Sequence, residues 1–98
     1  MSDARDLLSF LGTCPPKSFR LRTVTVQAGE TIGYRAADWV DTLVVVEVGA
    51  LEVECRSGTC ASFAEGAILV FTELEPSRIR NGGNGPLVLS ALSRIVTP

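Results

Sequence analysis

Apolar and polar residues alternate along most of the chain, with the period of strands and not of helices. Phe19–Gln27 alternates over nine residues, and Leu51–Cys55 alternates before the turn signal Arg56–Thr59. Alternation with a period of two is typical of a strand with one buried and one exposed face. Further short strands are expected at Ile32–Arg35, Asp41–Val48, Cys60–Phe63, Ala67–Phe71, Pro76–Arg80 and Leu87–Ile95.

Glycine-rich turns separate these strands, and the strongest turn signal is Asn81–Pro86. Nothing beyond residue 17 has the period of a helix. About eight short strands joined by such turns indicate an all-β protein, either an antiparallel sandwich or a barrel. Before the strands, three leucines (Leu7, Leu8 and Leu11) share one face of a predicted short helix that ends at Gly12.

The 98 residues fit a single domain. We expect the helix and a linker in residues 1–17 and the β-barrel in residues 18–98. The composition is globular, 46% hydrophobic and 20% charged. The net charge of −2 comes from scattered residues, which predicts no binding to nucleic acid or to a membrane surface. A chain this short gains from burying a further face against a second copy.

The expected location is the cytoplasm. Charged residues (Asp3, Arg5 and Asp6) stand where the apolar stretch of a secretory signal would begin. No apolar run is long enough to span a bilayer. An odd number of cysteines, three, does not make a paired disulfide framework.

The chain contains no histidine. Histidine is the usual general base near neutral pH and the commonest ligand of transition metals. Its absence excludes Ser–His and Cys–His catalysis, together with every metal site that is built from imidazoles.

Two stretches anchored by glycines have the spacing of a known pair of motifs. In the second stretch, Gly66 is followed at fixed intervals by Thr72, Leu74, Ser77 and Asn81. This spacing is similar to the second motif of the cupin family, in which a glycine is followed by proline, glycine, histidine and asparagine. The two end residues are retained, and Thr72, Leu74 and Ser77 replace the other three.

The first stretch resembles the other cupin motif, which reads Gly, His, His, Glu, Gly. Counting back from Gly49 puts Thr42 at the Glu position. The two His positions and the first Gly then fall on Arg35, Ala37 and Gly29. A second alignment, shorter by one residue, has Glu30, Ala36 and Asp38 in those places. The first alignment is preferred because it recovers a glycine in a turn.

The resemblance covers residues 29–81 and implies a cupin-type jelly-roll β-barrel. Cupins hold a metal through three imidazoles and a carboxylate, and those places are taken here by Arg35, Ala37, Thr42 and Ser77. Alanine is no ligand, hydroxyls are poor ligands for such metals, and a guanidinium repels a cation. We therefore expect no metal, no other cofactor and no metal-dependent cupin activity. Small cupins often pair through their sheets, so the resemblance also implies a homodimer.

The interior of the expected barrel offers apolar and neutral polar groups to a ligand. Thr42 is expected to point inward with the valines at every second position after it, because side chains alternate along a strand. By the same rule, Ser77 shares a face with Ile79 and Asn81. The residues expected to bind a small, partly apolar molecule are Tyr34, Arg35, Trp39, Thr42, Phe71, Ser77 and Asn81.

Each of these residues also has a structural interpretation. A small barrel is commonly filled by its own side chains. Arg35 is either an anchor for a carboxylate or phosphate or a surface charge. Trp39 is either a stacking platform or part of the core or a dimer interface, and Asn81 is either a ligand contact or the first residue of an Asn–Gly turn. The sequence leaves these alternatives open.

Cys55 and Cys60 flank the turn after the strand Leu51–Cys55. If Ser57 and Gly58 form a two-residue loop, the cysteines face each other at a non-hydrogen-bonded pair, where side chains come closest. A disulfide is then geometrically feasible, although a reducing cytoplasm favours two thiols.

These observations favour a metal-free cupin-like module that binds a small organic ligand or has a structural role, with no assignable catalysis. The alternative is a metal-independent enzyme of the isomerase, epimerase or cyclase type, for which Tyr34, Arg35 and Asp38 are the groups available to move protons. A third interpretation is an accessory subunit that docks through exposed edge strands or through the N-terminal helix, whose leucine face could contact the partner. That face can equally cap the chain's own barrel.

Overall fold

The computed structural model describes residues 18–94, so the predicted N-terminal helix lies outside the described residues. The elements in chain order are β1 (Phe19–Val26), β2 (Thr31–Gly33), α1 (Ala36–Trp39), β3 (Thr42–Val48), β4 (Leu51–Cys55), β5 (Cys60–Phe63), β6 (Ile68–Leu69), α2 (Phe71–Leu74), β7 (Pro76–Asn81) and β8 (Leu87–Arg94). The predicted all-β fold class is confirmed, because each helix has only four residues. No helix within residues 18–94 has the length and apolar character needed to cross a membrane.

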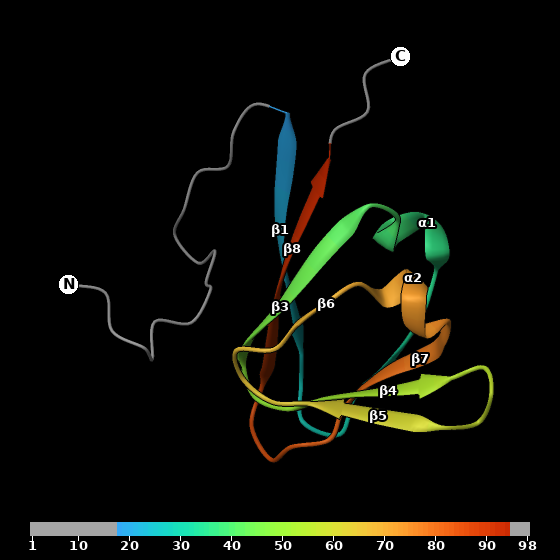
Figure 1. Ribbon diagram of the computed structural model, residues 1–98. Coiled ribbons are helices and arrows are strands. Elements are labelled where there is room, and N and C mark those ends of the chain that lie inside the picture. The colour runs from blue at the N-terminus through green and yellow to red at the C-terminus, as the bar shows by residue number, and fades with distance from the viewer. Residues whose placement is uncertain (1–17, 95–98) are drawn as a thin grey trace.

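The strands form two antiparallel four-stranded sheets (Figure 1). One sheet has the strand order β1-β8-β3-β6, and the other has the order β2-β7-β4-β5. In Figure 1 the strands β1, β8 and β3 of the first sheet cross the direction of β4, β5 and β7 of the second at a large angle. The helices α1 and α2 lie beside each other at one side of the molecule. Strand β8 is paired on both sides, with β1 and with β3.

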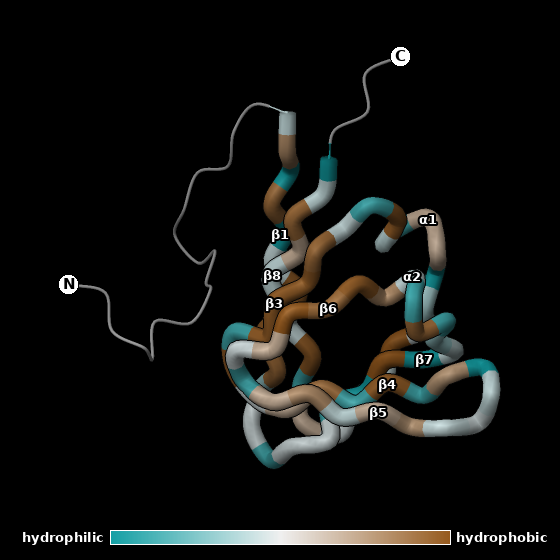
Figure 2. The backbone as a smooth tube through the Cα atoms, in the orientation of Figure 1, coloured by the Kyte–Doolittle hydropathy of each residue, from teal (hydrophilic) through white to brown (hydrophobic). Residues whose placement is uncertain are grey.

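The hydrophobic core lies between the two sheets. Its members are fully or almost fully buried. Burying a valine, leucine or isoleucine side chain stabilises the fold by about 1.5–3 kcal/mol relative to leaving it exposed. The core residues include Val26, Val44, Val46, Leu51, Val53, Ile79, Leu87, Leu89 and Ala91. Figure 2 shows the same distribution, with hydrophobic stretches along β3, β4, β6 and β7.

The two helical turns depart from the prediction of strands alone. The predicted strand Ala67–Phe71 ends two residues early, as β6, and Phe71 opens α2. A continued strand would keep Phe71 on the inward face with Leu69 but would turn Leu74 outward. A helical turn instead directs Phe71 and Leu74, three residues apart, into the same core. In the same way, α1 buries Trp39.

The β4–β5 hairpin corrects the predicted cysteine geometry. The Cys55 N–H donates to the Thr59 carbonyl at 2.8 Å, and the Gly58 N–H donates to the Cys55 carbonyl at 2.9 Å. The loop therefore has three residues, with Gly58 at a φ of +92°, which is a common bulged hairpin form. Cys60 consequently pairs with Glu54 and not with Cys55. The prediction that the two cysteines face each other is wrong, and both are free thiols.

Gly49, in the turn between β3 and β4, is held by two constraints. Its φ is +91°, and a Cβ placed on it would lie 2.6 Å from the carbonyl oxygen of Pro86. Gly58 has the same kind of φ with open space around it, and Gly33 has neither constraint. Substitutions at the three positions therefore distinguish the cost of a positive φ from the cost of steric overlap.

We predict that Gly58→Ala lowers the free energy of unfolding by about 1–2 kcal/mol, the cost of a left-handed conformation. Gly49→Ala is expected to cost more than this, because the Pro86 carbonyl must also shift. Gly33→Ala should change stability by less than about 1 kcal/mol. Urea unfolding followed by Trp39 fluorescence measures all three. Equal losses for Gly49→Ala and Gly58→Ala would contradict the close packing of the turn.

Candidate functional site

The aromatic residues predicted to bind a ligand pack against one another. The Trp39 and Phe71 rings meet edge to face with centroids 4.7 Å apart, and Tyr34 meets Phe71 in the same way at 6.2 Å. Phe71 and Trp39 are buried, whereas Tyr34 is half-buried. Such pairs stabilise a core by about 0.5–1.5 kcal/mol each. The cluster therefore fixes α1 and α2 to the core, and of its three rings only Tyr34 keeps an open surface.

Thr42 points into the sandwich with Val44, as predicted. Its hydroxyl donates to the Val40 carbonyl at 2.9 Å and lies 2.8 Å from the Ser93 hydroxyl on β8. Because the Thr42 proton is used by Val40, Ser93 is the donor between the two hydroxyls. The Thr42 hydroxyl is therefore occupied by bonds within the protein.

Asn81 makes the contacts of a turn residue. Its Nδ2 donates to the carbonyls of Val26 and Gly85, both at 2.8 Å, and its Oδ1 accepts from the Gly83 N–H at 2.9 Å. The side chain is buried, at 1% exposure. Each hydrogen bond joins Asn81 to backbone, so the amide holds together the end of β1 and the turn before β8.

The prediction that Ser77 faces inward with Ile79 and Asn81 is wrong. Ile79 and Asn81 are buried, but Ser77 is exposed. The pairing of β4 with β7 changes register between Glu54 and Cys55, which breaks the alternation at this point. The Ser77 hydroxyl then donates to the Glu54 carbonyl at 3.0 Å.

Arg35 and Ala37, at the positions of two metal ligands in the motif, are also on the surface. The Arg35 side chain is 81% exposed, and its Nε lies 3.9 Å from Oδ2 of Asp38. Among the described residues, no three His, Cys, Asp or Glu side chains form a group that suits a metal ion. The motif positions therefore supply neither the right donors nor a shared interior position.

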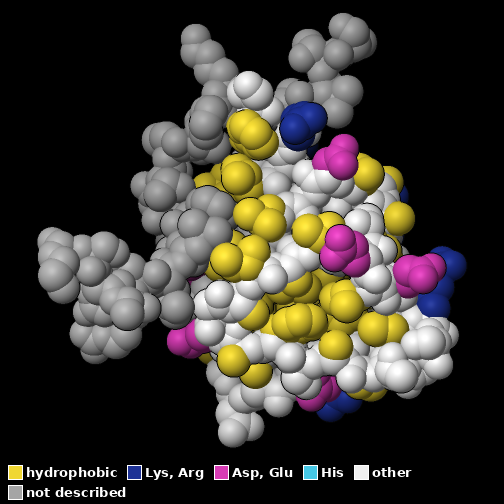
Figure 3. All heavy atoms as spheres, in the orientation of Figure 1, with side chains coloured by type: hydrophobic (Ala, Val, Ile, Leu, Met, Phe, Trp, Pro, Cys, Tyr) yellow, Lys and Arg dark blue, Asp and Glu magenta, His cyan; other side chains and the backbone are white. Residues whose placement is uncertain are grey.

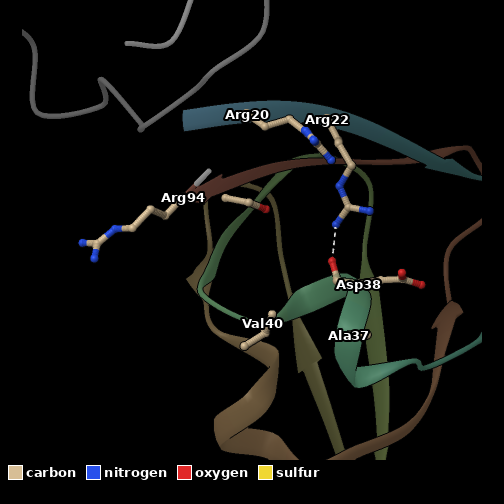
Figure 4. Close-up of a pocket in the computed structure, with 7 residues that line it drawn as sticks. Arg20, Arg22, Ala37, Asp38, Val40 and Arg94 are labelled. Atoms are coloured by element: carbon tan, nitrogen blue, oxygen red, sulfur yellow. Dashed lines mark hydrogen bonds between the residues drawn. The ribbon is translucent and has the colours of Figure 1, made fainter. Parts of the chain in front are cut away.

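A basic cavity of about 280 Å³ opens at the end of the sandwich where α1 meets β1 and β8. Its lining residues are Arg20, Arg22, Ala37, Asp38, Val40, Ser93 and Arg94. Figure 4 shows Arg20 and Arg22 extending from β1 toward α1, while Arg94 points away from them at the end of β8.

Arg22 is held in position within this cavity. Its Nη2 donates to the main-chain carbonyl of Asp38 at 2.6 Å, the bond drawn in Figure 4. Its guanidinium carbon also lies 4.9 Å from the centroid of the Trp39 ring, within the range of a cation–π contact. Arg20, two residues earlier on the same face of β1, is exposed. The cavity therefore presents one fixed and one adjustable guanidinium.

A second cavity of about 280 Å³ lies on the outer face of the other sheet, and it also contains two arginines, Arg78 and Arg80. Both are neutralised there. Arg78 Nε lies 2.8 Å from Oε1 of Glu54, and Arg80 Nε lies 3.8 Å from Oε1 of Glu52. This cavity is a charge-balanced surface of the sheet.

A third cavity, of about 210 Å³, lies between the β2–α1 connection and α2. Its lining residues are Tyr34, Ala36, Arg56, Thr72, Glu75 and Pro76. Tyr34 is thus the predicted ligand residue that borders an open space. Arg56 and Glu75 bring opposite charges to its rim, so the cavity has no net charge to select a ligand.

The arginines of the basic cavity were missed because Phe19–Gln27 was interpreted as one alternating strand. The apolar residues of β1 change phase: Phe19 and Leu21 lie on one face, and Val24 and Val26 lie on the other. Arg20 and Arg22 therefore occupy the inward face, beyond the point where the valines reach the core. The change of phase is visible in the sequence and is the signal that identifies them.

Comparison with known proteins identifies no relative from which a function could be inferred, so the function is inferred from the fold and the cavities. No protein-family model matches the chain, and no curated protein matches it.

We predict that Asn81→Ala lowers the free energy of unfolding by at least about 2 kcal/mol, because it leaves buried backbone groups without partners. Ser77→Ala, at the exposed motif position, should change it by less than about 0.5 kcal/mol. Chemical denaturation of both variants provides the measurement. A small effect at Asn81 would show that the turn does not depend on its amide.

Proposed function

We propose that this protein is a metal-free cupin-like module, built on a jelly roll, that forms a homodimer and binds a small organic ligand or has a structural role. The observation that carries the proposal is the strand pairing. The pairs β1–β8, β2–β7, β3–β6 and β4–β5 are all antiparallel and are nested around the β4–β5 hairpin. A long hairpin of four strand pairs that rolls up has this pairing, and two four-stranded sheets are the jelly-roll arrangement that cupins use.

The motif glycines give further support. Gly29, Gly49 and Gly66 have φ values of +79°, +91° and +88°, so all three stand at turns that favour glycine. The preferred alignment of the first motif depends on Gly29. The conformation at Gly29 agrees with that alignment, which also assigns Arg35 and Ala37 to metal-ligand positions.

The absence of imidazole from the chain supports the metal-free part of the proposal. The motif positions carry a guanidinium, a methyl group and two hydroxyls, and these are not ligands for iron, manganese, nickel or zinc. Because the core between the sheets is packed, the spaces left for a ligand are the surface cavities beside α1 and α2. We further propose a cytoplasmic location, where Cys55 and Cys60 remain thiols.

The outer faces of the two sheets differ, and this difference supports the homodimer. On the β2-β7-β4-β5 sheet the outward residues are charged and paired, as in Glu54–Arg78 and Glu52–Arg80. On the other sheet, Leu21, Leu92 and Leu43 lie side by side across β1, β8 and β3.

The leucine row, which is half-buried, belongs to a wider outer face that also holds Val45 and Ser90, both fully buried in the single chain. All three leucines alternate with core positions, so they point away from the core. Ile68, paired with Val45 on the same sheet, is 50% exposed. Figure 3 shows hydrophobic side chains gathered in the middle of the visible face, with charged side chains among and around them. An outward face is expected to be polar unless another surface covers it. We assign a second copy of the chain as the covering surface.

The enzyme alternative gains no support from the geometry. Arg35 and Asp38 form an exposed ion pair, and the Tyr34 ring packs on Phe71. These groups do not form a hydrogen-bonded arrangement that could abstract a proton and return it.

We predict that native mass spectrometry of protein purified without a histidine tag gives the mass of two chains without metal. Elemental analysis of the same sample should find far less than one transition metal per chain. An adduct of one metal per chain would overturn the metal-free assignment. A mass of one chain at all concentrations would overturn the homodimer, and a complex with a different chain would favour the accessory-subunit interpretation.

We also predict that Leu43→Glu raises the dimer dissociation constant by about 100-fold or more, because a buried unpaired carboxylate costs about 3 kcal/mol. Ser62→Glu, at an exposed position on the β5 strand of the other sheet, is the matched control and should leave the dimer intact. Size-exclusion chromatography with light scattering measures the mass, and near-UV circular dichroism checks the fold. If Leu43→Glu unfolds the protein, Leu92→Ser provides a milder change in the same row. A folded variant that stays dimeric would place the interface elsewhere.

A further inference from the structure

We infer that Arg20 and Arg22 form a binding site for the anionic group, a carboxylate or a phosphate, of a small organic molecule. The site is the basic cavity between β1, β8 and α1. It deepens the proposed binding function, on which it rests, by giving the ligand a location and a charge. It depends neither on the homodimer nor on the absence of a metal.

The two arginines share one face of β1. Cross-strand pairing places Arg20 opposite Ser93 and Arg22 opposite Ala91. Ala91 belongs to the core, so both guanidinium groups lie on the face that continues into the interior. Side chains two residues apart on a strand project in the same direction, and both arginines line the same cavity. Their positive charges therefore act on a common space.

No carboxylate neutralises these arginines within residues 18–94. Asp38 is the acidic residue of the cavity, but it offers Arg22 its main-chain carbonyl, and its Oδ2 lies beside Arg35. In Figure 4 the Asp38 carboxylate points away from Arg20 and Arg22. The paired arginines of the second cavity show how this chain balances such charges elsewhere. The guanidinium groups of Arg20 and Arg22, which no carboxylate of residues 18–94 neutralises, repel each other. A bound anion would reduce that repulsion.

The remaining groups fit a small anion. Arg22 is held by the Asp38 carbonyl and by the Trp39 ring, so little conformational freedom is lost when it binds. Arg20 can turn toward the ligand, because no described residue forms an ion pair with it. A guanidinium presents a planar fork of donors that matches a carboxylate or phosphate. A volume of about 280 Å³ suits a molecule of metabolite size.

The test is a two-dimensional NMR titration of the full chain with sodium phosphate and, separately, with succinate. Ionic strength is held constant with sodium chloride. We expect saturable shifts in the amide signals of Arg20, Arg22, Asp38 and Ser93. Tighter binding of phosphate would assign a phosphorylated ligand, and tighter binding of succinate would assign a carboxylate.

Arg20→Gln is the informative variant, since the Arg20 side chain forms no hydrogen bond or ion pair with another residue of the range 18–94. It should weaken binding about tenfold, the effect expected for loss of a charge-assisted hydrogen bond. Arg20→Lys retains the positive charge but not the planar fork of donors, so its affinity for the anion should lie between those of the wild type and Arg20→Gln. Arg78→Gln, which removes an arginine on the opposite sheet, is the matched control and should not change the affinity.

Shifts that do not saturate, or equal affinities in wild type, Arg20→Gln and Arg78→Gln, would overturn the site. A metal-free dimer in the mass spectrum together with no anion binding would remove this site while leaving the proposed module in place. The two failures are therefore distinguishable.

Discussion

The packing of two four-stranded sheets across one aliphatic core determines where every other feature of this protein lies. Each strand must turn one set of alternate side chains toward that core, and β8, paired on both sides, sets the alternation for its sheet. Its inward residues Leu87, Leu89 and Ala91 are fully buried. The remaining side chains of each strand then point to the outer face of its sheet. The outer face carries paired charges on one sheet and a row of leucines on the other, and the proposed dimer follows from this difference.

The sequence predicted the strands well because each strand needs only local alternation and a turn at its end. β4 and β5 begin and end at the predicted residues, and β3 differs by one. The errors arose where long-range contacts override alternation. A register change beside Glu54 turns Ser77 outward, and a helical turn brings Leu74 against the core beside Phe71. Neither can be obtained from the local pattern, because both depend on which strand becomes a neighbour.

The candidate site was predicted less well than the fold, for a related reason. The motif positions identified residues by spacing, but spacing does not state what a side chain contacts. The Asn81 amide forms hydrogen bonds with three backbone groups, and the Trp39 ring packs against Phe71 and Arg22. The basic cavity appears only when β1 is divided into its two phases, which places Arg20 and Arg22 inward. The same phase change places Leu21 on the outer face, so one irregularity of the sequence underlies both the proposed anion site and the proposed dimer surface.

The most direct test of this account is the exposure of the leucine row to a soluble nitroxide probe, measured by methyl NMR over a range of protein concentrations. We predict that the methyl signals of Leu21, Leu43 and Leu92 are shielded from the probe at high concentration and become broadened on dilution. The methyl signal of Thr31, exposed on the charged sheet, should be broadened throughout. Leucine signals that are exposed at every concentration, or that stay shielded where light scattering gives the mass of one chain, would contradict a face that a second copy covers.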